Sequence, residues 1–339
     1  MLAAPMKQWK AAHWTGAFLS TKPGQPTANL TLRGGGTIDG NGSAWWQVTH
    51  DDLHYRPGMA ALANVAGLTI EDVLLLNSPN HNIFLSNCTG VRVRRLRVSA
   101  PHHSPNTDGI NFAGGSDQSI EDSHISNGDD CVSIVTGSQT TAAPALAGGG
   151  QIPYGGNVLV RNVTCDGGHG VSIGSIKHGL VTNATIEDVR FVGSDNGARI
   201  KTYPSASKCA LPSWRLLLPM PAADNQGLVS GITYRNITMQ AVVNPILIDG
   251  AYCPKSQKPY PCPPGKVAVA ITDILFEDIS GTALTGRLGN LDCSAVPHSC
   301  ENITLRDVHL KPSLGGGKGK FQCTNAAGAK WIDSSPGCG

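Results

Sequence analysis

Ile186-Glu187-Asp188-Val189 is one of eight copies of a four-residue unit that recurs along the chain. Each copy begins with an apolar residue, continues with two mostly polar or charged residues, and usually ends with a second aliphatic residue. The starts of successive copies are separated by 23, 27, 40, 26, 48, 42 and 29 residues. The other copies are Ile70-Glu71-Asp72-Val73, Val93-Arg94-Arg95-Leu96, Ile120-Glu121-Asp122-Ser123, Val160-Arg161-Asn162-Val163, Tyr234-Arg235-Asn236-Ile237, Phe276-Glu277-Asp278-Ile279 and Leu305-Arg306-Asp307-Val308.

This spacing determines the expected fold. A period in the twenties, with short β-branched segments and no amphipathic helix between them, indicates a solenoid of stacked parallel strands. Each coil would bury an inward ladder of Val, Ile and Leu, and the longer spacings would be loops that bulge from one coil. A β-sandwich would explain the variable spacing but not the recurring unit. We therefore predict an all-β protein with a single parallel β-helix domain over residues 1–339.

The composition excludes several classes of protein. Charged residues make up 15% of the chain and Gly occurs 41 times, which favours short strands and turns over long surface helices. A formal net charge of +2 is too small to indicate nucleic acid or a membrane surface as a partner. No apolar run approaches the ~20 residues that a membrane span needs.

Ten cysteines suit an oxidising compartment. No CxxC pairs with a second CxxC or with spaced histidines, so we expect no zinc site. The cysteines close to one another lead us to expect a disulfide-stapled C-terminal tail over residues 312–339. The neighbouring pairs are Cys253 with Cys262, Cys293 with Cys300, and Cys323 with Cys338.

Seven Asn-x-Ser/Thr sequons permit two interpretations, either attached glycans or asparagines that suit the starts of strands. They begin at Asn29, Asn41, Asn87, Asn162, Asn183, Asn236 and Asn302. The first residues, Met1 to Lys7, contain no apolar segment of signal-peptide length. For an extracellular protein, the mature chain would then start elsewhere or an N-terminal segment would be missing from this sequence.

Two stretches interrupt the repeat. Residues 140–151 are rich in Ala and Gly and are predicted to form a flexible loop. Residues 208–226 contain Trp214-Arg215-Leu216-Leu217-Leu218-Pro219, an apolar insert that fits neither neighbouring coil. We interpret this insert as either a lineage-specific loop or retained intron sequence.

Four short motifs fall on successive predicted coils. They are Ser104-Pro105-Asn106-Thr107-Asp108-Gly109-Ile110, Asn127-Gly128-Asp129-Asp130-Cys131-Val132-Ser133-Ile134, Gly167-Gly168-His169-Gly170-Val171-Ser172-Ile173-Gly174 and Arg199-Ile200-Lys201-Thr202. Asp108 and Asp129 are 21 residues apart, close to one repeat, so stacked coils would place them side by side. His169 and Arg199 follow after 40 and 30 further residues, and the Ala/Gly-rich loop accounts for the excess in the first gap.

The three aspartates Asp108, Asp129 and Asp130 together indicate acid/base chemistry. Neighbouring carboxylates oppose one another's ionisation, so one of them should keep its proton to higher pH, as a general acid must. Cleavage of a glycosidic bond needs such an acid for the leaving oxygen and a base for water. On a regular strand Asp129 and Asp130 would point to opposite faces, so both can serve only if the backbone turns, which Gly128 would permit. Taken singly, each aspartate could be a surface residue that satisfies a turn.

The remaining motifs add cations and hydrogen-bonding groups. Arg199 and Lys201 would project from the same face of a strand and neutralise an anionic sugar, although an isolated Arg-x-Lys is usually a solvated strand face. His169, between glycines, would be either a surface turn residue or a partner that orients the acid or the sugar. Tyr252 could contact sugar or simply precede a disulfide loop.

A resemblance to a known family rests on the four motifs in this order: Asn106-Thr107-Asp108-Gly109, Gly128-Asp129-Asp130-Cys131, Gly167-Gly168-His169-Gly170 and Arg199-Ile200-Lys201. Together they resemble the polygalacturonases of glycoside hydrolase family 28, especially plant-type members. The resemblance runs from about Arg33 to the C-terminus. It implies a right-handed parallel β-helix that hydrolyses pectin polygalacturonate with inversion, without metal or cofactor. The expected protein is a monomer of the extracellular space or cell wall whose partner is this polysaccharide.

The resemblance also implies catalytic roles. Asp129 matches the proton donor of the family. Asp108 and Asp130 match the pair that activates water. His169 matches the histidine that is needed for activity.

The same resemblance implies binding roles. Arg199 and Lys201 match the residues that bind the galacturonate carboxylate. Asn106 matches a neighbouring sugar contact, and Tyr252 matches the tyrosine at the substrate cleft.

Two further points concern the cysteines and the chain's departures from the family. Cys131 and Cys165 match a disulfide beside the active site, which leaves Cys88 and Cys209 without assigned partners. Members normally have a signal peptide and another coil or two before the region where this sequence begins. The insert at 208–226 directly follows the Arg199–Lys201 strand and could obstruct the cleft.

Two alternatives to hydrolysis stay open at this stage. A pectate lyase shares the solenoid but eliminates rather than hydrolyses, using calcium-binding carboxylates and a cationic base. A catalytically silent pectin-binding wall protein would use the same coils, with its catalytic groups disabled by the insert or the truncation.

Overall fold

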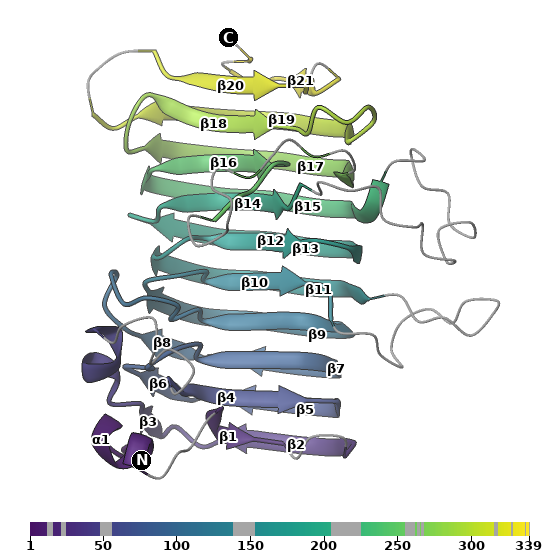
Figure 1. Cartoon of the computed structure of the whole chain (residues 1–339). Helices are drawn as coiled ribbons and strands as arrows, with labels where there is room; N and C mark the ends of the chain where they lie inside the picture. The colour runs from purple at the N-terminus through teal and green to yellow at the C-terminus, as the bar shows by residue number, and fades with distance from the viewer. Residues whose placement is uncertain are drawn as a thin grey trace, which may run out of the picture.

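The structure, a computed structural model, is an elongated stack of parallel strands (Figure 1). It describes residues 1–11, 16–21, 25–47, 56–137, 153–204, 225–254, 262, 265, 268–314, 318–326, 328–335 and 337–338. Each coil of the chain pairs in parallel with the coil before it and the coil after it. The predicted all-β parallel β-helix is therefore confirmed.

The coils form three faces. Face 1 consists of β1 (Ala17–Ser20), β4 (Gly58–Ala63), the starts of β7 (Ile83–Arg94) and β9 (Ile110–Asn127), β10 (Val132–Val135), β12 (Val171–Ile176), β14 (Asn196–Thr202), β16 (Asn244–Asp249), β18 (Arg287–Asp292) and β20 (Lys320–Thr324). Face 2 consists of β2 (Thr27–Arg33), β5 (Val65–Glu71), the later parts of β7 and β9, the first parts of β11 (Tyr154–Gly167), β13 (Gly179–Val192), β15 (Asn225–Val242), β17 (Ala268–Ala283) and β19 (Cys300–Pro312), and β21 (Lys330–Ile332).

Face 3 completes each coil. It consists of β3 (Thr37–Asp39), β6 (Leu74–Leu76), β8 (Arg97–Ser99) and the ends of the long strands from β9 to β19. The only described helices are α1 (Met6–Ala11) and the 3-10 helix η1 (Gly42–Gln47), both at the N-terminal end. None of the described helices is long and apolar enough to cross a membrane.

The four-residue unit is the corner between faces 2 and 3. Its third residue has φ between 49° and 56° in all eight copies, which is the left-handed region that Asn and Asp tolerate better than most residues. The first residue of every copy is buried and pairs with the first residue of the next copy. The repeat therefore exists because each coil must turn the same corner and fill the same interior layer.

The asparagines of the seven sequons also occupy positions with a left-handed backbone. All seven sequon asparagines have φ between 49° and 56°, so each occupies a left-handed position. Several also bond to the neighbouring coil, as Asn162 does when its Nδ2 donates to Asp122 Oδ1 at 2.8 Å. Backbone geometry alone accounts for asparagine at these places.

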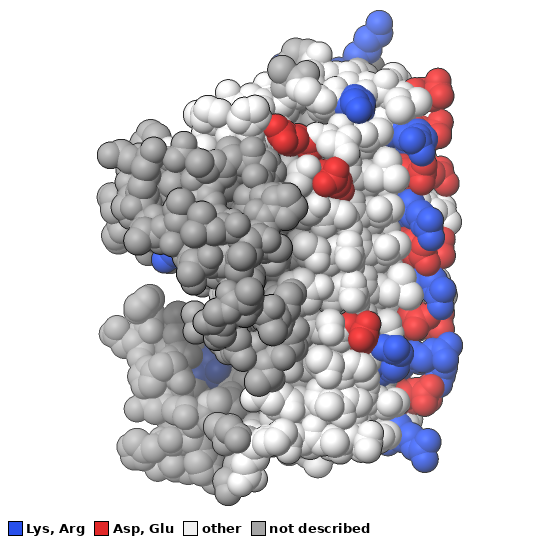
Figure 2. Space-filling view, turned by 90° about the vertical axis from the view of Figure 1, so that its right-hand side faces the viewer, with Lys and Arg blue, Asp and Glu red and all other residues white. Residues whose placement is uncertain are grey.

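The second residue of the unit forms a ladder of alternating charge. From coil to coil the sign alternates without exception, and the contacts include Arg235 Nε with Glu187 Oε2 at 2.8 Å and Arg306 with Glu277 at 2.7 Å. Figure 2 shows the resulting column of acidic and basic side chains along one edge of the molecule. The ladder runs Arg33, Glu71, Arg94, Glu121, Arg161, Glu187, Arg235, Glu277 and Arg306. The alternation prevents like charges from stacking directly opposite one another.

The solenoid continues on both sides of the two stretches that interrupt the repeat. The predicted loop at 140–151 lies outside the described residues, as does the insert at 208–226 as far as residue 224. The strands on either side pair directly, β9 with β11 and β13 with β15, so the solenoid continues across both stretches.

Four disulfides are formed among the residues that the structure describes. They are Cys131–Cys165, Cys253–Cys262, Cys293–Cys300 and Cys323–Cys338, so the staple in the predicted tail is present. Cys88 is a buried free thiol, and Cys209 lies outside the described residues.

The charge ladder leads to a test of stability. Glu187→Lys would place a third cation between Arg161 and Arg235, so we expect its thermal midpoint to fall several degrees further than that of the neutral control Glu187→Gln. High salt should reduce the difference in thermal midpoint between the two variants, because salt screens the interactions between exposed charges. Equal midpoints for both variants at low salt would show that the alternation does not matter.

Candidate active site

Three aspartates lie where the chain enters the strands of face 1. Asp129 and Asp130 are in the turn between β9 and β10, and Asp108 is in the turn that precedes β9. The backbone ladder continues through these turns, since the N–H of Gly109 donates to the carbonyl of Asp130 at 2.9 Å. Asp108 and Asp130 therefore occupy matching positions on neighbouring coils, with Asp129 one residue earlier.

Gly128 has the role of allowing the turn, as the sequence predicted, through close approach between coils. A Cβ at this position would lie 2.3 Å from the carbonyl oxygen of Ser104. The Gly128 N–H donates to Thr107 Oγ1 at 3.0 Å. In this turn Asp129 and Asp130 escape the alternation of a regular strand.

Two buried asparagines hold the turns in place. Nδ2 of Asn127 donates to the carbonyls of Thr107 and Asp130, each at 2.9 Å. One coil earlier, Nδ2 of Asn82 donates to the carbonyls of Thr107 at 3.1 Å and Asp108 at 3.0 Å. Both side chains are fully buried, so these amides lock the main chain that carries the aspartates.

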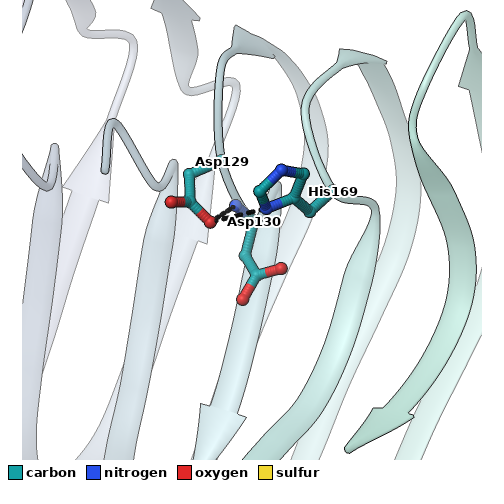
Figure 3. Close-up of side chains that lie close together, drawn as sticks. All are labelled: Asp129, Asp130 and His169. Carbon is teal, nitrogen blue, oxygen red and sulfur yellow. Dashed lines mark hydrogen bonds and ion pairs between the residues drawn. The ribbon is translucent and has the colours of Figure 1, made fainter. Parts of the chain in front are cut away.

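Asp129 is paired with His169 (Figure 3). His169 Nδ1 lies 2.9 Å from Asp129 Oδ1, and the His169 N–H donates to the Asp129 carbonyl at 2.8 Å. Burial by itself would raise the pKa of Asp129, but the hydrogen bond and the charge of His169 outweigh it and lower the pKa to about 2. The same bond raises the pKa of His169 above its ordinary 6.5. The pair therefore shares one proton over a wide pH range.

His169 can reach Asp129 because of the glycine before it. Gly168 has φ of 59°, and a Cβ there would lie 2.2 Å from the Asp129 carbonyl oxygen. Only glycine allows this close, left-handed approach of the two coils. The imidazole also lies near a second carboxylate, with Nε2 at 3.6 Å from Asp195 Oδ2.

Asp130 points away from Asp129 and towards two cations. Its Oδ2 accepts a bond from Lys201 Nζ at 2.9 Å, and its Oδ1 lies 3.6 Å from Arg199 Nη1. Ser172 Oγ donates to the same Oδ1 at 2.7 Å. Asp130, Arg199 and Lys201 are each no more than 7% exposed, so this is a buried ion cluster in which two cations face one carboxylate.

Asp108 has no such compensation. It is 6% exposed, and its nearest described ionisable contact is His81, whose Nδ1 lies 3.6 Å from Asp108 Oδ1. Burial, followed by the negative charges of Asp129 and Asp130, raises the pKa of Asp108 well above its ordinary 3.8. Burial also lowers the pKa of His81, so this histidine supplies no lasting positive charge at neutral pH. The carboxyl group that keeps its proton to higher pH is therefore Asp108 and not Asp129, the residue that matches the family's proton donor.

Tyr252 and Asn106 complete the set. The cations of Arg199 and Lys201 lie 5.8 and 5.5 Å from the centroid of the Tyr252 ring, within cation–π range. Asn106 Nδ2 donates to Asp129 Oδ2 at 3.4 Å.

The sequence-predicted site residues thus all lie in one cluster. Sequence reasoning missed the residues that support them. Asn127 and Ser172 stood in the second and third motifs without an assigned role, and Asn82 stood outside the four motifs. These supporting residues are Asn82, Asn127, Ser172, His81, Arg56 and Asp195.

One donor set has the spacing of a metal site. Single donor atoms of Asp129, Asp130 and His169 lie within 4.8 Å of one another. His169 Nδ1 already faces Asp129, and both oxygens of Asp130 already accept bonds from Ser172 and Lys201. Because Lys201 would also repel a divalent ion, these residues do not fit a resident metal.

Comparison with known proteins identifies the family. The model of glycosyl hydrolases family 28 matches residues 6–211 and 221–335. The chain belongs to this family. The resemblance drawn from the four motifs is therefore confirmed.

Relatives within family 28 include plant proteins named polygalacturonase. Polygalacturonase-2 of Solanum lycopersicum is 33% identical over 291 residues, which cover 83% of this chain and 55% of that protein. The polygalacturonase of Juniperus ashei is 32% identical over 300 residues, which cover 85% of this chain and 51% of that protein. The chain thus spans about half the length of these relatives.

Solved structures agree on the fold. A polygalacturonase from Erwinia carotovora matches with a TM-score of 0.69 and 25% identity, over 91% of this chain and 72% of that one. An endo-xylogalacturonan hydrolase from Aspergillus tubingensis matches with a TM-score of 0.68 and 22% identity, over 96% of this chain and 82% of that one. The family 28 β-helix therefore describes this chain.

The electrostatics of Asp108 lead to a test of stability against pH. Below the unfolded-state pKa both states of the wild type hold the Asp108 proton. As pH rises, the unfolded chain releases it first, so the wild type loses stability until the raised folded-state pKa is passed. Each pH unit between the two pKa values is worth about 1.4 kcal/mol.

Asp108→Asn removes this penalty. We therefore expect the variant to gain thermal stability relative to the wild type at pH 7 but much less at pH 3.5. Thermal midpoints of both proteins at the two pH values measure the effect. A difference that does not change with pH would contradict the raised pKa.

Proposed function

We propose that this chain hydrolyses the α-1,4-galacturonosidic bonds of polygalacturonate by single-displacement general acid/base catalysis. The observation that carries this proposal is the cluster of three aspartates with His169, Arg199 and Lys201 on consecutive coils of a family 28 β-helix. Glycosidic cleavage requires an acid and a base of this kind, and an anionic sugar requires cations beside them.

Arg199 and Lys201 would bind the negatively charged carboxylate of the substrate. Both cations are held on adjacent outward positions of β14 and against the Tyr252 ring. Lys201 already bonds Asp130, so a galacturonate carboxylate would share its positive charge rather than find it free. Arg199 has the longer contact to Asp130 and is the better candidate for two bonds to substrate.

Asp129 would be the proton donor, acting with His169. The raised pKa of His169 means that the pair keeps one proton to above pH 6.5. In the free protein that proton resides mainly on the imidazole, because the pKa of Asp129 is about 2. Burial of the pair by substrate disfavours two separated charges, so the proton would move to Asp129 and from there to the leaving oxygen.

Asp108 and Asp130 would hold and activate water. The raised pKa of Asp108 marks it as the stronger base of the site once ionised. Asp130 has both oxygens hydrogen-bonded, to Ser172 and Lys201, which weakens it as a nucleophile towards the sugar but leaves lone pairs that can accept from water. It would orient the water while Asp108 takes the proton.

We argue for a single displacement from the hydrogen bonds to Asp130 and not from the distance between the carboxyl groups. Single oxygens of Asp129 and Asp130 lie within 4.8 Å, closer than the ~6.5–9.5 Å usual between the carboxyl groups of inverting enzymes. A retaining mechanism would need one of these carboxylates as a nucleophile. Asp130 is hydrogen-bonded to Ser172 and Lys201, and Asp129 is bound to His169, so both carboxylates are weakened as nucleophiles.

The same proposal extends to location and partner. Four disulfides suit an oxidising, extracellular compartment, where the polysaccharide of the cell wall would be the partner. We also propose that the chain acts as one domain and as a monomer.

The acid assignment is tested by Asp129→Asn. We expect the release of reducing ends from polygalacturonate to fall by about 10²–10⁴-fold, the usual contribution of a general acid, while oligogalacturonate binding survives. An oligogalacturonosyl fluoride, whose leaving group needs no proton, should be hydrolysed much more nearly at the wild-type rate.

Asp108→Asn is the matched control, because loss of the base should abolish turnover of both substrates. The opposite pattern would exchange the two roles. A product that absorbs in the near ultraviolet would indicate elimination, and binding without any turnover by the wild type would indicate a silent binding protein.

The single-displacement course is tested by ¹H NMR. The α-linked polymer should give β anomers at the new reducing ends in the first minutes, before mutarotation. If α anomers come first, the reaction proceeds through a covalent intermediate and the reading of Asp130 is wrong.

A further inference from the structure

Arg56 is a buried cation beside the site that the four motifs do not include. Its residue is 7% exposed, and it lies two residues before β4, two coils before the turn that carries Asp108. Among the described residues, no carboxylate lies within salt-bridge distance of its guanidinium. Burying an arginine whose nearest counter-charge among the described residues is the more distant Asp129 is costly, so a purely structural role explains it poorly.

The terminal nitrogens of Arg56 are all engaged with neutral acceptors. Nη2 donates to Asn106 Oδ1 at 2.5 Å and to Asn80 Oδ1 at 3.5 Å. Nη1 donates to the Pro105 carbonyl at 3.3 Å. Nε is buried and has no partner in the described structure. No pair of nitrogens is left free to grip a substrate carboxylate.

The bond to Asn106 decides which way its amide faces. A guanidinium can only donate, so the oxygen of the Asn106 amide must turn towards Arg56. The nitrogen then turns towards Asp129 and donates to Oδ2 at 3.4 Å. The Asn106 residue is exposed, so without Arg56 only the 3.4 Å bond to Asp129 would orient its amide.

Only one carboxylate oxygen of Asp129, Oδ2, is held by the Asn106 amide. Its Oδ1 contacts His169 Nδ1 at 2.9 Å and accepts from its neighbour, the Asp130 N–H, at 2.8 Å. Its Oδ2 has Asn106 as its only hydrogen-bond donor among the described residues. The negative charge of Asp129 also acts on Arg56, opposing the burial that lowers the arginine's pKa. The two ends of the chain Arg56–Asn106–Asp129 are thus electrostatically coupled.

We propose that Arg56 is a positioning residue that orients the Asn106 amide and, through it, the carboxylate of Asp129 for proton transfer. This inference rests on the proposed hydrolysis of polygalacturonate. Arg56 would act on the turnover step and not on substrate affinity, since it has no free group to offer the sugar. A misplacement of about 1 Å at a reacting group costs on the order of 10²-fold in rate.

The test is a double-mutant cycle on reducing-end release from polygalacturonate. We expect Arg56→Met to lower kcat by about 10–100-fold with KM changed less than about threefold, and the isosteric Asn106→Leu to lower kcat by a similar factor. The double variant should be no slower than the slower single variant, because both changes break one relay. Arg56→Lys, which can still donate to Asn106, should recover part of kcat.

Other outcomes overturn the inference in distinguishable ways. A raised KM at unchanged kcat would make Arg56 a substrate-binding residue. Additive effects in the cycle, with a lowered thermal midpoint and no recovery in Arg56→Lys, would make it structural. Wild-type kcat in folded Arg56→Met would remove the role while leaving the hydrolysis intact. An inactive wild type would instead refute the proposed function, and this inference with it.

Discussion

The whole molecule depends on the fixed distance between stacked parallel strands. Neighbouring strands lie about 4.8 Å apart, so every side chain faces its counterpart on the coils above and below. Apolar counterparts benefit from this arrangement, and Tyr234 and Phe276 stack in the interior with ring centroids 5.4 Å apart. Charged counterparts would repel, and the alternating ladder from Arg33 to Arg306 removes that repulsion. The same strand spacing therefore favours repeated apolar residues inside the solenoid and charges of alternating sign on its surface.

The candidate active site breaks the rule of alternation. Asp108 and Asp130 hold matching positions on adjacent coils, and Asp129 adds a third negative charge. Compensation is unequal, because Lys201 and Arg199 neutralise Asp130 and His169 neutralises Asp129, while Asp108 remains buried with no lasting cation. Local rules tend to fail where function needs them to, and the raised pKa of Asp108 is the consequence here.

Asparagine has two separate uses in this fold. At the corners it adopts the left-handed backbone that each coil needs, as Asn162 and Asn236 do within the repeat unit. In the site, Asn82 and Asn127 use buried amides to tie the turns of consecutive coils together. The first use leaves a regular pattern in the sequence. The second does not, because Asn82 and Asn127 lie outside the repeat unit.

The sequence by itself determined the solenoid, since a corner that recurs every coil imposes the same residue types at the same spacing. It also determined which residues are candidates for the chemistry, because the four motifs fall on successive coils. Only the tertiary structure decided the charge state of each aspartate. Asp108, Asp129 and Asp130 are alike in sequence, and their pKa values diverge because burial and the partners of each carboxylate come from coils up to 71 residues away. The role of Arg56 was hidden for the same reason, since its partner Asn106 is 50 residues further along the chain and only the stacking of coils brings the two together.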